Sequence, residues 1–545
     1  MSMRHDNIVK TIIESALSDL DRRDIVRRIW QKDHTVWKPQ PAEITNRLGW
    51  LTVADLMREH LAALQSFALD IANSGIKHIV LLGMGGSSLG AEVLRQTFGT
   101  THGFPELIIL DSTVPDSIRF VKDSIDLHHT LFMVSSKSGS TTEPLMFYRY
   151  FRELIESTIG SEKAGEHFIA ITDSGTPLAD IAARDGFRRV FTNPADIGGR
   201  YSVLSYFGLA PAVAAGININ LLIERSRLMK AACASHVPIQ DNPAVHLGAY
   251  MGSLALQGRD KLTLFTSPSV HSFGLWLEQL IAESTGKEGK GIIPIVDEPL
   301  YDVFLYGEDR CFVYLRCQKD DNSITDNMIK TLASSGHPIL TIDIQDIYDL
   351  GAEFYRWEFA TAVAGALLQI NPFDQPNVQQ SKRETESILD QYARSQRLPE
   401  NTDIQSPSAL FAGVEKNDYC AIMAYMRQTP QTDEQLTELR RRITKKYGIA
   451  TTLGYGPRFL HSTGQLHKGG PGSGIFLQIV IDTESDIPVP GAPYTFGIIA
   501  AAQALGDIKA LQSAQRRIAS IRLPADKDMA IQKVMIRDVF PLLEN

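Results

Sequence analysis

The chain has few cysteines, no basic excess and no hydrophobic run long enough for a membrane span. Its 545 residues include only four cysteines, Cys233, Cys311, Cys317 and Cys420. They form no CxxC pair and no metal-ligand spacing, which argues against a disulfide framework and predicts small buried side chains. A net charge of −9 argues against broad nucleic-acid binding. The most apolar stretches, 201–217 and 359–370, are too short or too interrupted to cross a bilayer.

The remaining bulk features are those of an ordinary globular protein. The chain is 43% hydrophobic and 21% charged, and its length allows two to four domains. The first residues are polar and precede a helical pattern over 8–20, which does not resemble a signal peptide. We therefore expect a cytoplasmic protein without membrane or nucleic-acid partners.

Alternating strand and helix patterns indicate an α/β fold. Five predicted strands, 78–82, 107–110, 131–134, 167–172 and 189–192, alternate with helices, which is typical of a doubly wound parallel sheet. A proline-containing break near 237–243 precedes a second unit, with predicted strands 261–265, 291–296, 310–315 and 338–344. We predict two such domains, 76–235 and 244–485, the second with an insertion near 398–416 and with strands at 418–425 and 475–481. Helical extensions are expected at 1–75 and 486–545, the latter containing a strand-like segment at 518–523.

Two loops carry residues suited to binding a phosphate. An apolar strand at 131–134 leads into Ser136-Lys137-Ser138-Gly139-Ser140-Thr141-Thr142, and a helical pattern follows. Hydroxyls, free backbone N–H groups and a helix N-terminus suit a phosphate dianion. The strand 78–82 likewise ends in Gly83-Met84-Gly85-Gly86-Ser87-Ser88-Leu89-Gly90. Glycines also make ordinary tight turns, and Ser140 with Glu143 could form a capping box. Together the two loops indicate a sugar-phosphate enzyme.

Other segments carry side chains that could perform chemistry. Arg200 follows a glycine pair before an apolar helix and could stabilise an oxyanion. Glu283 lies in the last turn of a predicted helix, where the helix dipole disfavours a carboxylate, which hints at function. Lys382 lies on a helix after a proline turn. His461 and His467 are spaced poorly for two metal ligands, so one of them as an acid–base group is more attractive than a zinc site. Each of these residues could also be structural or simply exposed.

Taken together, these segments resemble the phosphoglucose isomerase family, whose members have two sugar-isomerase (SIS) domains. The resemblance runs from about residue 78 to 470 and is carried by five segments: 82–90, 136–142, 198–202, 279–287 and 373–382. It extends to the isomerase half of bifunctional transaldolase–phosphoglucose isomerases, through 33–37 and 461–470. In common family members the histidine segment precedes the final lysine motif, whereas here it follows Lys382.

The resemblance implies a reaction and a set of roles. Glucose 6-phosphate and fructose 6-phosphate would interconvert through ring opening and a cis-enediolate. Glu283 would move the proton between C2 and C1, Arg200 would stabilise the enediolate, and His467 with Lys382 would open the ring. Neither a metal nor a cofactor would be needed. The substrate would be bound by Gly86, Ser87, Ser136, Lys137, Ser138, Thr141, Gln279 and Gln375.

Alternatives stay open from the sequence. The pocket could serve another hexose phosphate such as mannose 6-phosphate, or the chain could be a non-catalytic sugar-phosphate sensor. A sensor would not need Glu283, Arg200 and Lys382 together, and it usually adds a DNA-binding helix-turn-helix. The family likeness suggests a homodimer in which the neighbour could supply one active-site residue. A functional link to a transaldolase is a further expectation.

Overall fold

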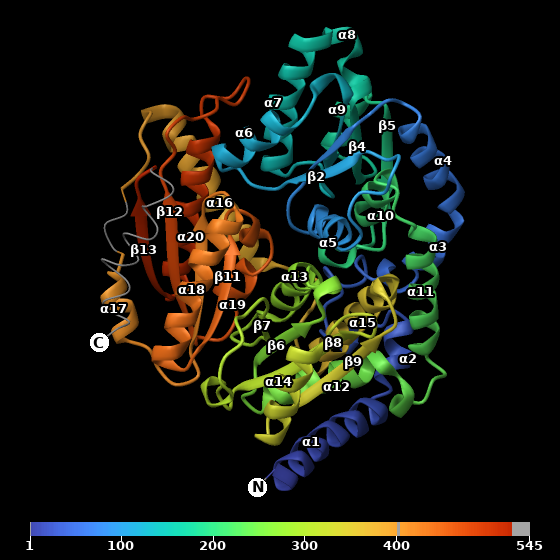
Figure 1. The fold of residues 1–545 in the computed structure, drawn as a ribbon, viewed down its shortest axis with the longest axis vertical. Coiled ribbons are helices and arrows are strands. Elements are labelled where there is room, and N and C mark those ends of the chain that lie inside the picture. Colours follow the sequence, from blue (N-terminus) through green and yellow to red (C-terminus); the bar gives the residue numbers. More distant parts are fainter. Residues whose placement is uncertain (1, 401–403, 526–545) are drawn as a thin grey trace.

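The chain is organised around three parallel β-sheets (Figure 1). The computed structural model describes residues 2–400 and 404–525. Apolar runs such as Ile79–Leu82 are fully buried, because helices cover both faces of a parallel sheet. The first sheet has the order β2-β1-β3-β4-β5. Its strands are β1 His78–Leu82, β2 Glu106–Leu110, β3 Thr130–Ser135, β4 Phe168–Asp173 and β5 Arg189–Asn193.

Helices flank this first sheet and alternate with its strands, as the sequence pattern predicted. They are α5 Leu89–Phe98, α6 Pro115–Ser124, α7 Thr142–Ile159, α8 Ser161–Ala164, α9 Pro177–Arg184 and α10 Tyr206–Ala214. Proline opens α6 and α9, where its missing N–H costs no hydrogen bond. The strand order reverses between β1 and β3, and a sheet of this kind holds ligands at such a reversal.

The second sheet has the order β7-β6-β8-β9. Its strands are β6 Lys261–Thr266, β7 Ile293–Ile295, β8 Arg310–Cys317 and β9 Ile339–Ile344. The helices of this part are α11 Ile219–Ala232, α12 Pro243–Leu256, α13 Phe273–Thr285, α14 Ser323–Ser334, α15 Leu350–Leu368 and α16 Pro376–Ser395. The predicted strands of both sheets are confirmed to within a few residues. One continuous apolar core joins this unit to one face of the first sheet and to the N-terminal helices.

The N-terminal segment is helical, as predicted. It contains α1 Ser2–Arg22, α2 Ile25–Trp30, α3 Val53–Glu59 and α4 Leu61–Ala72. Trp37, between α2 and α3, is buried, and its indole N–H donates to the carbonyl of Ala362 on α15 at 2.8 Å. The segment is therefore packed into the body of the protein.

A third sheet combines strands from the predicted end of the second domain with the strand-like segment predicted in the tail. Its order is β11-β10-β12-β13, with β10 Tyr419–Tyr425, β11 Ala450–Tyr455, β12 Gly474–Ile481 and β13 Arg517–Leu523. The accompanying helices are α17 Pro407–Ala412, α18 Pro430–Tyr447, α19 Gly464–Gly469 and α20 Phe496–Ser513. The parallel-sheet α/β class is confirmed, but the expected boundaries missed this separate unit. Pairing of β12 with β13 crosses the boundary predicted at 485. The final helix expected after β13 lies outside the described residues.

Two further expectations concern burial and membranes. All four cysteines are buried and unpaired, as their number and spacing predicted. Within residues 2–400 and 404–525, none of the helices has both the length and the apolarity needed to cross a bilayer.

Candidate active site

A cleft of about 470 Å³ lies where the three sheet units meet. The first unit contributes the loops after β1 and β3, on either side of the reversal in strand order. The second contributes α13 and the start of α16, and the third contributes η11 (Arg458–His461) and α20. Most of the sequence-predicted site residues line this cleft: Gly86, Ser87, Lys137, Ser138, Thr141, Arg200, Gln279, Glu283, Gln375 and Lys382.

The hydroxyl-rich loop forms one end of the cleft. Ser138, Ser140 and Thr141 line it, ahead of the N-terminus of α7. Gly139 has φ +64°, and a side chain there would collide with Thr176, so only glycine fits this bend. Lys137 is ion-paired with Asp173 and donates to the carbonyl of Ala195 at 3.1 Å. Contacts within the first unit therefore fix the position of the Lys137 ammonium at the cleft.

Ser136 does not line the cleft, contrary to the sequence-based expectation. It is 1% exposed, and its hydroxyl donates to that of Thr141 at 3.0 Å. Its place is therefore beneath the loop, where it orients Thr141. In this position the Ser136 side chain does not reach a ligand in the cleft.

The glycine loop approaches the Gly198-Gly199-Arg200 turn at very short range. A Cβ on Gly86 would lie 2.2 Å from the carbonyl oxygen of Gly199, so a larger residue would push the two turns apart. This close packing places Ser87 and Arg200 in the same cleft. The absence of a side chain at Gly86 therefore allows Ser87 and Arg200 to line the same cleft.

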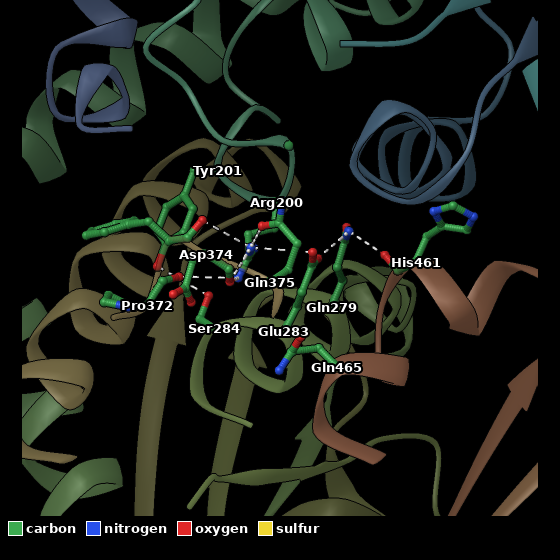
Figure 2. A network of polar contacts seen from close by, with 12 residues as sticks. Arg200, Tyr201, Gln279, Glu283, Ser284, Pro372, Asp374, Gln375, His461 and Gln465 are labelled. Carbon is green, nitrogen blue, oxygen red and sulfur yellow. Dashed lines mark hydrogen bonds and ion pairs between the residues drawn. The ribbon is translucent and has the colours of Figure 1, made fainter. Parts of the chain in front are cut away.

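The guanidinium of Arg200 is buried and held by backbone carbonyls (Figure 2). It donates to the carbonyls of Phe373 and Asp374 at 3.1 to 3.3 Å and to Oε1 of Gln375 at 2.5 Å. Its Nη2 lies 3.4 Å from Oε1 of Glu283. A permanently charged, preoriented donor thus lies beside a carboxylate in the cleft.

Glu283 is the other half of that pair, and it lies in the last turn of α13, as predicted. Its Oε2 accepts from Nε2 of Gln279, one turn earlier, at 3.0 Å. Nε2 of Gln279 also donates to the carbonyl of His461 at 2.8 Å, which ties the second unit to the third (Figure 2). The Oε1 atom of Gln279 is buried and has no hydrogen-bond partner among the described residues.

Lys287 supports the turn that holds Arg200. Its ammonium donates to the carbonyl of Asn371 and to Oδ1 of Asp374 at 2.5 and 2.6 Å. Burial and the charge of Arg200 lower the pKa of Lys287, and Asp374 opposes that change. The turn over 371–375 is therefore fixed from both sides, which sets the position of the Arg200 guanidinium.

The structure separates the two histidines that the sequence left as alternatives. His461, on η11, lines the cleft, and its Nε2 lies 3.0 Å from Oε1 of Glu143. The bidentate pair between Arg458 and Asp111, with two contacts of 2.9 Å, anchors η11 to the first unit. Burial alone would raise the pKa of Glu143, but the charge and hydrogen bond of His461 outweigh burial and lower it. His461 thus faces an ionised carboxylate.

His467, the histidine chosen from the sequence, lies outside the cleft. It is buried with its ring against Phe459 and Phe476, and its Nδ1 has no hydrogen-bond partner within the described chain. Burial and the charges of Lys468 and Arg516 lower its pKa well below the usual value. His467 is thus enclosed away from the cleft, whereas His461 lines it.

Sequence reasoning also missed residues that only the fold brings to the cleft. Arg47, Glu143, His461 and Gln503 line it. The suggested capping box between Ser140 and Glu143 is absent, because the N-cap is Thr141 and Glu143 bonds to His461 instead. The sequence offered two signals for them, a glutamate just after the hydroxyl loop and a second histidine in the 461–470 segment.

Comparisons with known proteins identify relatives of this chain. A family model described as phosphoglucose isomerase matches residues 50–296. A glucose-6-phosphate isomerase of Bacillus cereus strain B4264 is 30% identical over 398 residues, covering 63% of this chain and 86% of that protein. One from Staphylococcus saprophyticus is 29% identical and covers 68% and 91%.

Solved structures show the same fold. A glucose-6-phosphate isomerase from Chlamydia trachomatis superposes with a TM-score of 0.60 at 20% identity, over 70% of this chain and 86% of that one. A hypothetical protein from Thermus thermophilus gives a TM-score of 0.59 at 23% identity, over 69% and 96%.

Proposed function

Because this chain belongs to the phosphoglucose isomerase family, we propose that the cleft between its three sheet units is the place where its reaction occurs. The chain is an aldose–ketose isomerase that interconverts glucose 6-phosphate and fructose 6-phosphate. The observation that carries the proposal for the site is the pairing of Glu283 with Arg200 at 3.4 Å, in the same cleft as the hydroxyl loop.

Glu283 is the base that transfers the proton between C2 and C1. Aldose–ketose exchange needs one base on one face of the sugar and positive charge near the two oxygens of the enediolate. The Arg200 guanidinium, held by carbonyls and always charged, supplies that charge without reorganising. As the proton leaves carbon, negative charge moves from Glu283 to the enediolate oxygens beside Arg200.

His461 and Lys382 open the ring. Opening a pyranose requires a proton donor at the ring oxygen and a base at the C1 hydroxyl. His461 faces the ionised Glu143, and Lys382 lines the cleft from α16, the helix that follows Gln375. An imidazole that faces a carboxylate suits the donor role, and Lys382 supplies a second polar group to the same cleft. Gln279 and Gln375 position the hydroxyls, for which the unpartnered Oε1 of Gln279 is a suitable acceptor.

The phosphate occupies the hydroxyl loop. Ser87, Ser138 and Thr141 donate hydroxyls there, Lys137 lies nearby, and the N-terminus of α7 adds a favourable dipole. Arg47, from the N-terminal segment, lines the same end and is the side chain that sequence reasoning did not include.

Replacing Ser138 with aspartate is expected to abolish productive binding. A carboxylate at this position would face the phosphate dianion in a partly enclosed cleft, and the repulsion would raise KM by about 100-fold or more. Ser157→Asp, on the exposed surface of α7, is a matched control that should leave KM unchanged. A KM for Ser138→Asp equal to that of the wild type would place the phosphate elsewhere.

The function itself is tested by a coupled assay. Fructose 6-phosphate is supplied with EDTA and without added metal, and glucose 6-phosphate is followed through its dehydrogenase. Robust turnover in EDTA is the expected result, since the proposed steps use only protein groups. Loss of turnover in EDTA would contradict the metal-free mechanism. If mannose 6-phosphate were the better substrate, the chain would be assigned as an isomerase of that epimer instead.

Several expectations accompany this proposal. A cytoplasmic location, a homodimer and a functional link to a transaldolase remain predictions from the sequence. His461, Lys382 and Glu283 of one chain line the same cleft, which supports a site built by a single chain. We propose that each chain builds a complete site.

A further inference from the structure

Gln503 is a buried cleft residue that the mechanism above leaves unused. It lies on α20 in the third unit and is 4% exposed. Its Nε2 donates to Oε1 of Glu143 at 2.6 Å, and its Oε1 accepts from the hydroxyl of Thr113 at 2.7 Å. A carboxylate can only accept, so the amide must turn its nitrogen to Glu143 and its oxygen to Thr113. Glu143 therefore fixes the orientation of the amide, and the hydroxyl of Thr113 donates to the amide oxygen.

The oxygen of Glu143 that accepts from Gln503 is also the oxygen that faces His461, at 3.0 Å. Four side chains thus form one line, Thr113–Gln503–Glu143–His461. They come from the loop after β2, from α20, from α7 and from η11. Gln503 is a neutral hydrogen-bond donor. It therefore stabilises the Glu143 carboxylate and leaves the contact between Glu143 and His461 in place.

Helix α20 is held rigidly enough for such a role. Phe496 at its start stacks on Phe147 of α7, the helix that carries Glu143, at 5.8 Å between ring centroids. Near its end, Asp507 pairs with Lys468 of α19 at 2.5 Å, and both side chains are fully buried. The helix is fixed to the first unit on one side and to the third on the other, and Gln503 lies between these contacts.

We infer that Gln503 is a positioning residue for ring opening, which holds the Glu143 carboxylate in place so that Glu143 orients the imidazole of His461 towards the ring oxygen. The inference rests on the proposed role of His461. Without the Gln503 amide, the buried Glu143 carboxylate would lose one hydrogen-bond donor. The carboxylate would then fix the orientation of the His461 imidazole less firmly.

The pH dependence of ring opening gives a specific signature. The charged groups that lower the pKa of Glu143 are His461 and Lys382, and burial raises it. Removing a donor to the ionised form raises the pKa of a carboxyl further. Glu143 would then become protonated at a higher pH, so the acidic limb of the activity profile would move upward.

The test uses Gln503→Leu and Gln503→Glu in the full chain. Gln503→Glu keeps the shape but places a second carboxyl at hydrogen-bond distance from Glu143, and like charges would force a shared proton. Ring opening is read directly as exchange between the α and β anomers of glucose 6-phosphate by NMR, in a Glu283→Gln background where isomerisation is blocked. Lys509→Ala, on the same helix but outside the cleft, is the control.

We expect anomer exchange to slow by about 10- to 100-fold in both Gln503 variants, while the affinity for glucose 6-phosphate stays within about threefold of that of the Glu283→Gln parent. The acidic limb of the exchange rate is expected at higher pH in Gln503→Leu. Unchanged exchange, or a loss that follows thermal stability without a shift of the acidic limb, would overturn the inference. If the wild-type chain itself did not isomerise fructose 6-phosphate, the proposed function would fail first, so the two failures are distinguishable.

Discussion

Glu283→Gln is expected to reduce kcat by about 10³- to 10⁴-fold while leaving the affinity for sugar phosphate nearly unchanged. The amide is close to isosteric with the carboxylate, and its single oxygen can still accept from one of the two donors, Gln279 or Arg200. It cannot, however, take a proton from carbon. We therefore expect the loss to fall on the chemical step, because other residues of the cleft form the proposed phosphate site.

The measurement combines kcat with direct binding of 6-phosphogluconate, an open-chain sugar phosphate, by calorimetry. Glu288→Gln is the matched control, since Glu288 lies just beyond α13 and pairs at the surface with Lys38. That variant should keep wild-type turnover. Near wild-type turnover in Glu283→Gln would remove Glu283 from the mechanism, and loss of 6-phosphogluconate binding would indicate a structural role instead.

His461→Asn and His467→Asn are expected to behave oppositely. The first removes the proposed proton donor from the cleft and should lower kcat by about 10²- to 10⁴-fold, with little change in thermal stability. The second removes a buried ring packed against Phe459 and Phe476, and should cost about 1–3 kcal/mol of stability with modest change in kcat. Turnover and melting temperature of both variants decide the assignment. If His467→Asn alone lost turnover while remaining folded, the assignment would be reversed.

The same variants show whether one chain builds the whole site. Co-expressed His461→Asn and Glu283→Gln chains should remain inactive together, because each site would lack one of the two residues. If the histidine came from a neighbouring chain, mixed dimers would contain one intact site and a measurable part of the activity would return. Recovery in the mixture would therefore contradict the proposal that each chain is complete.

Much of the fold could be predicted because its signals are local. Buried parallel strands are short apolar runs, and β1 was predicted residue for residue as His78–Leu82. β11, Ala450–Tyr455, was missed because its threonines and glycine carry a weaker apolar signal. The third sheet was missed for a different reason. Its membership depends on pairing of β12 with β13, about 40 residues apart, and local periodicity does not report which strands pair.

The candidate site, like the fold, has features that the local sequence indicated and features that it did not. Ser138, Arg200, Glu283 and Lys382 belong to compact segments whose residue types already indicated chemistry, and the structure places them in one cleft. Ser136 belongs to such a segment too, but its side chain turns inward to Thr141. A loop sequence indicates a binding function without specifying which of its hydroxyls face the ligand.

The sequence alone determined the α/β class, the two ligand loops and the family resemblance, because each of these depends on residues close together in the chain. Only the tertiary structure showed that His461 lines the cleft and His467 does not, and it revealed the partners of Glu143. Those partners lie 318 and 360 residues away along the chain. The burial and charge that distinguish a proton donor from a packed ring exist only once three sheets have come together around the cleft.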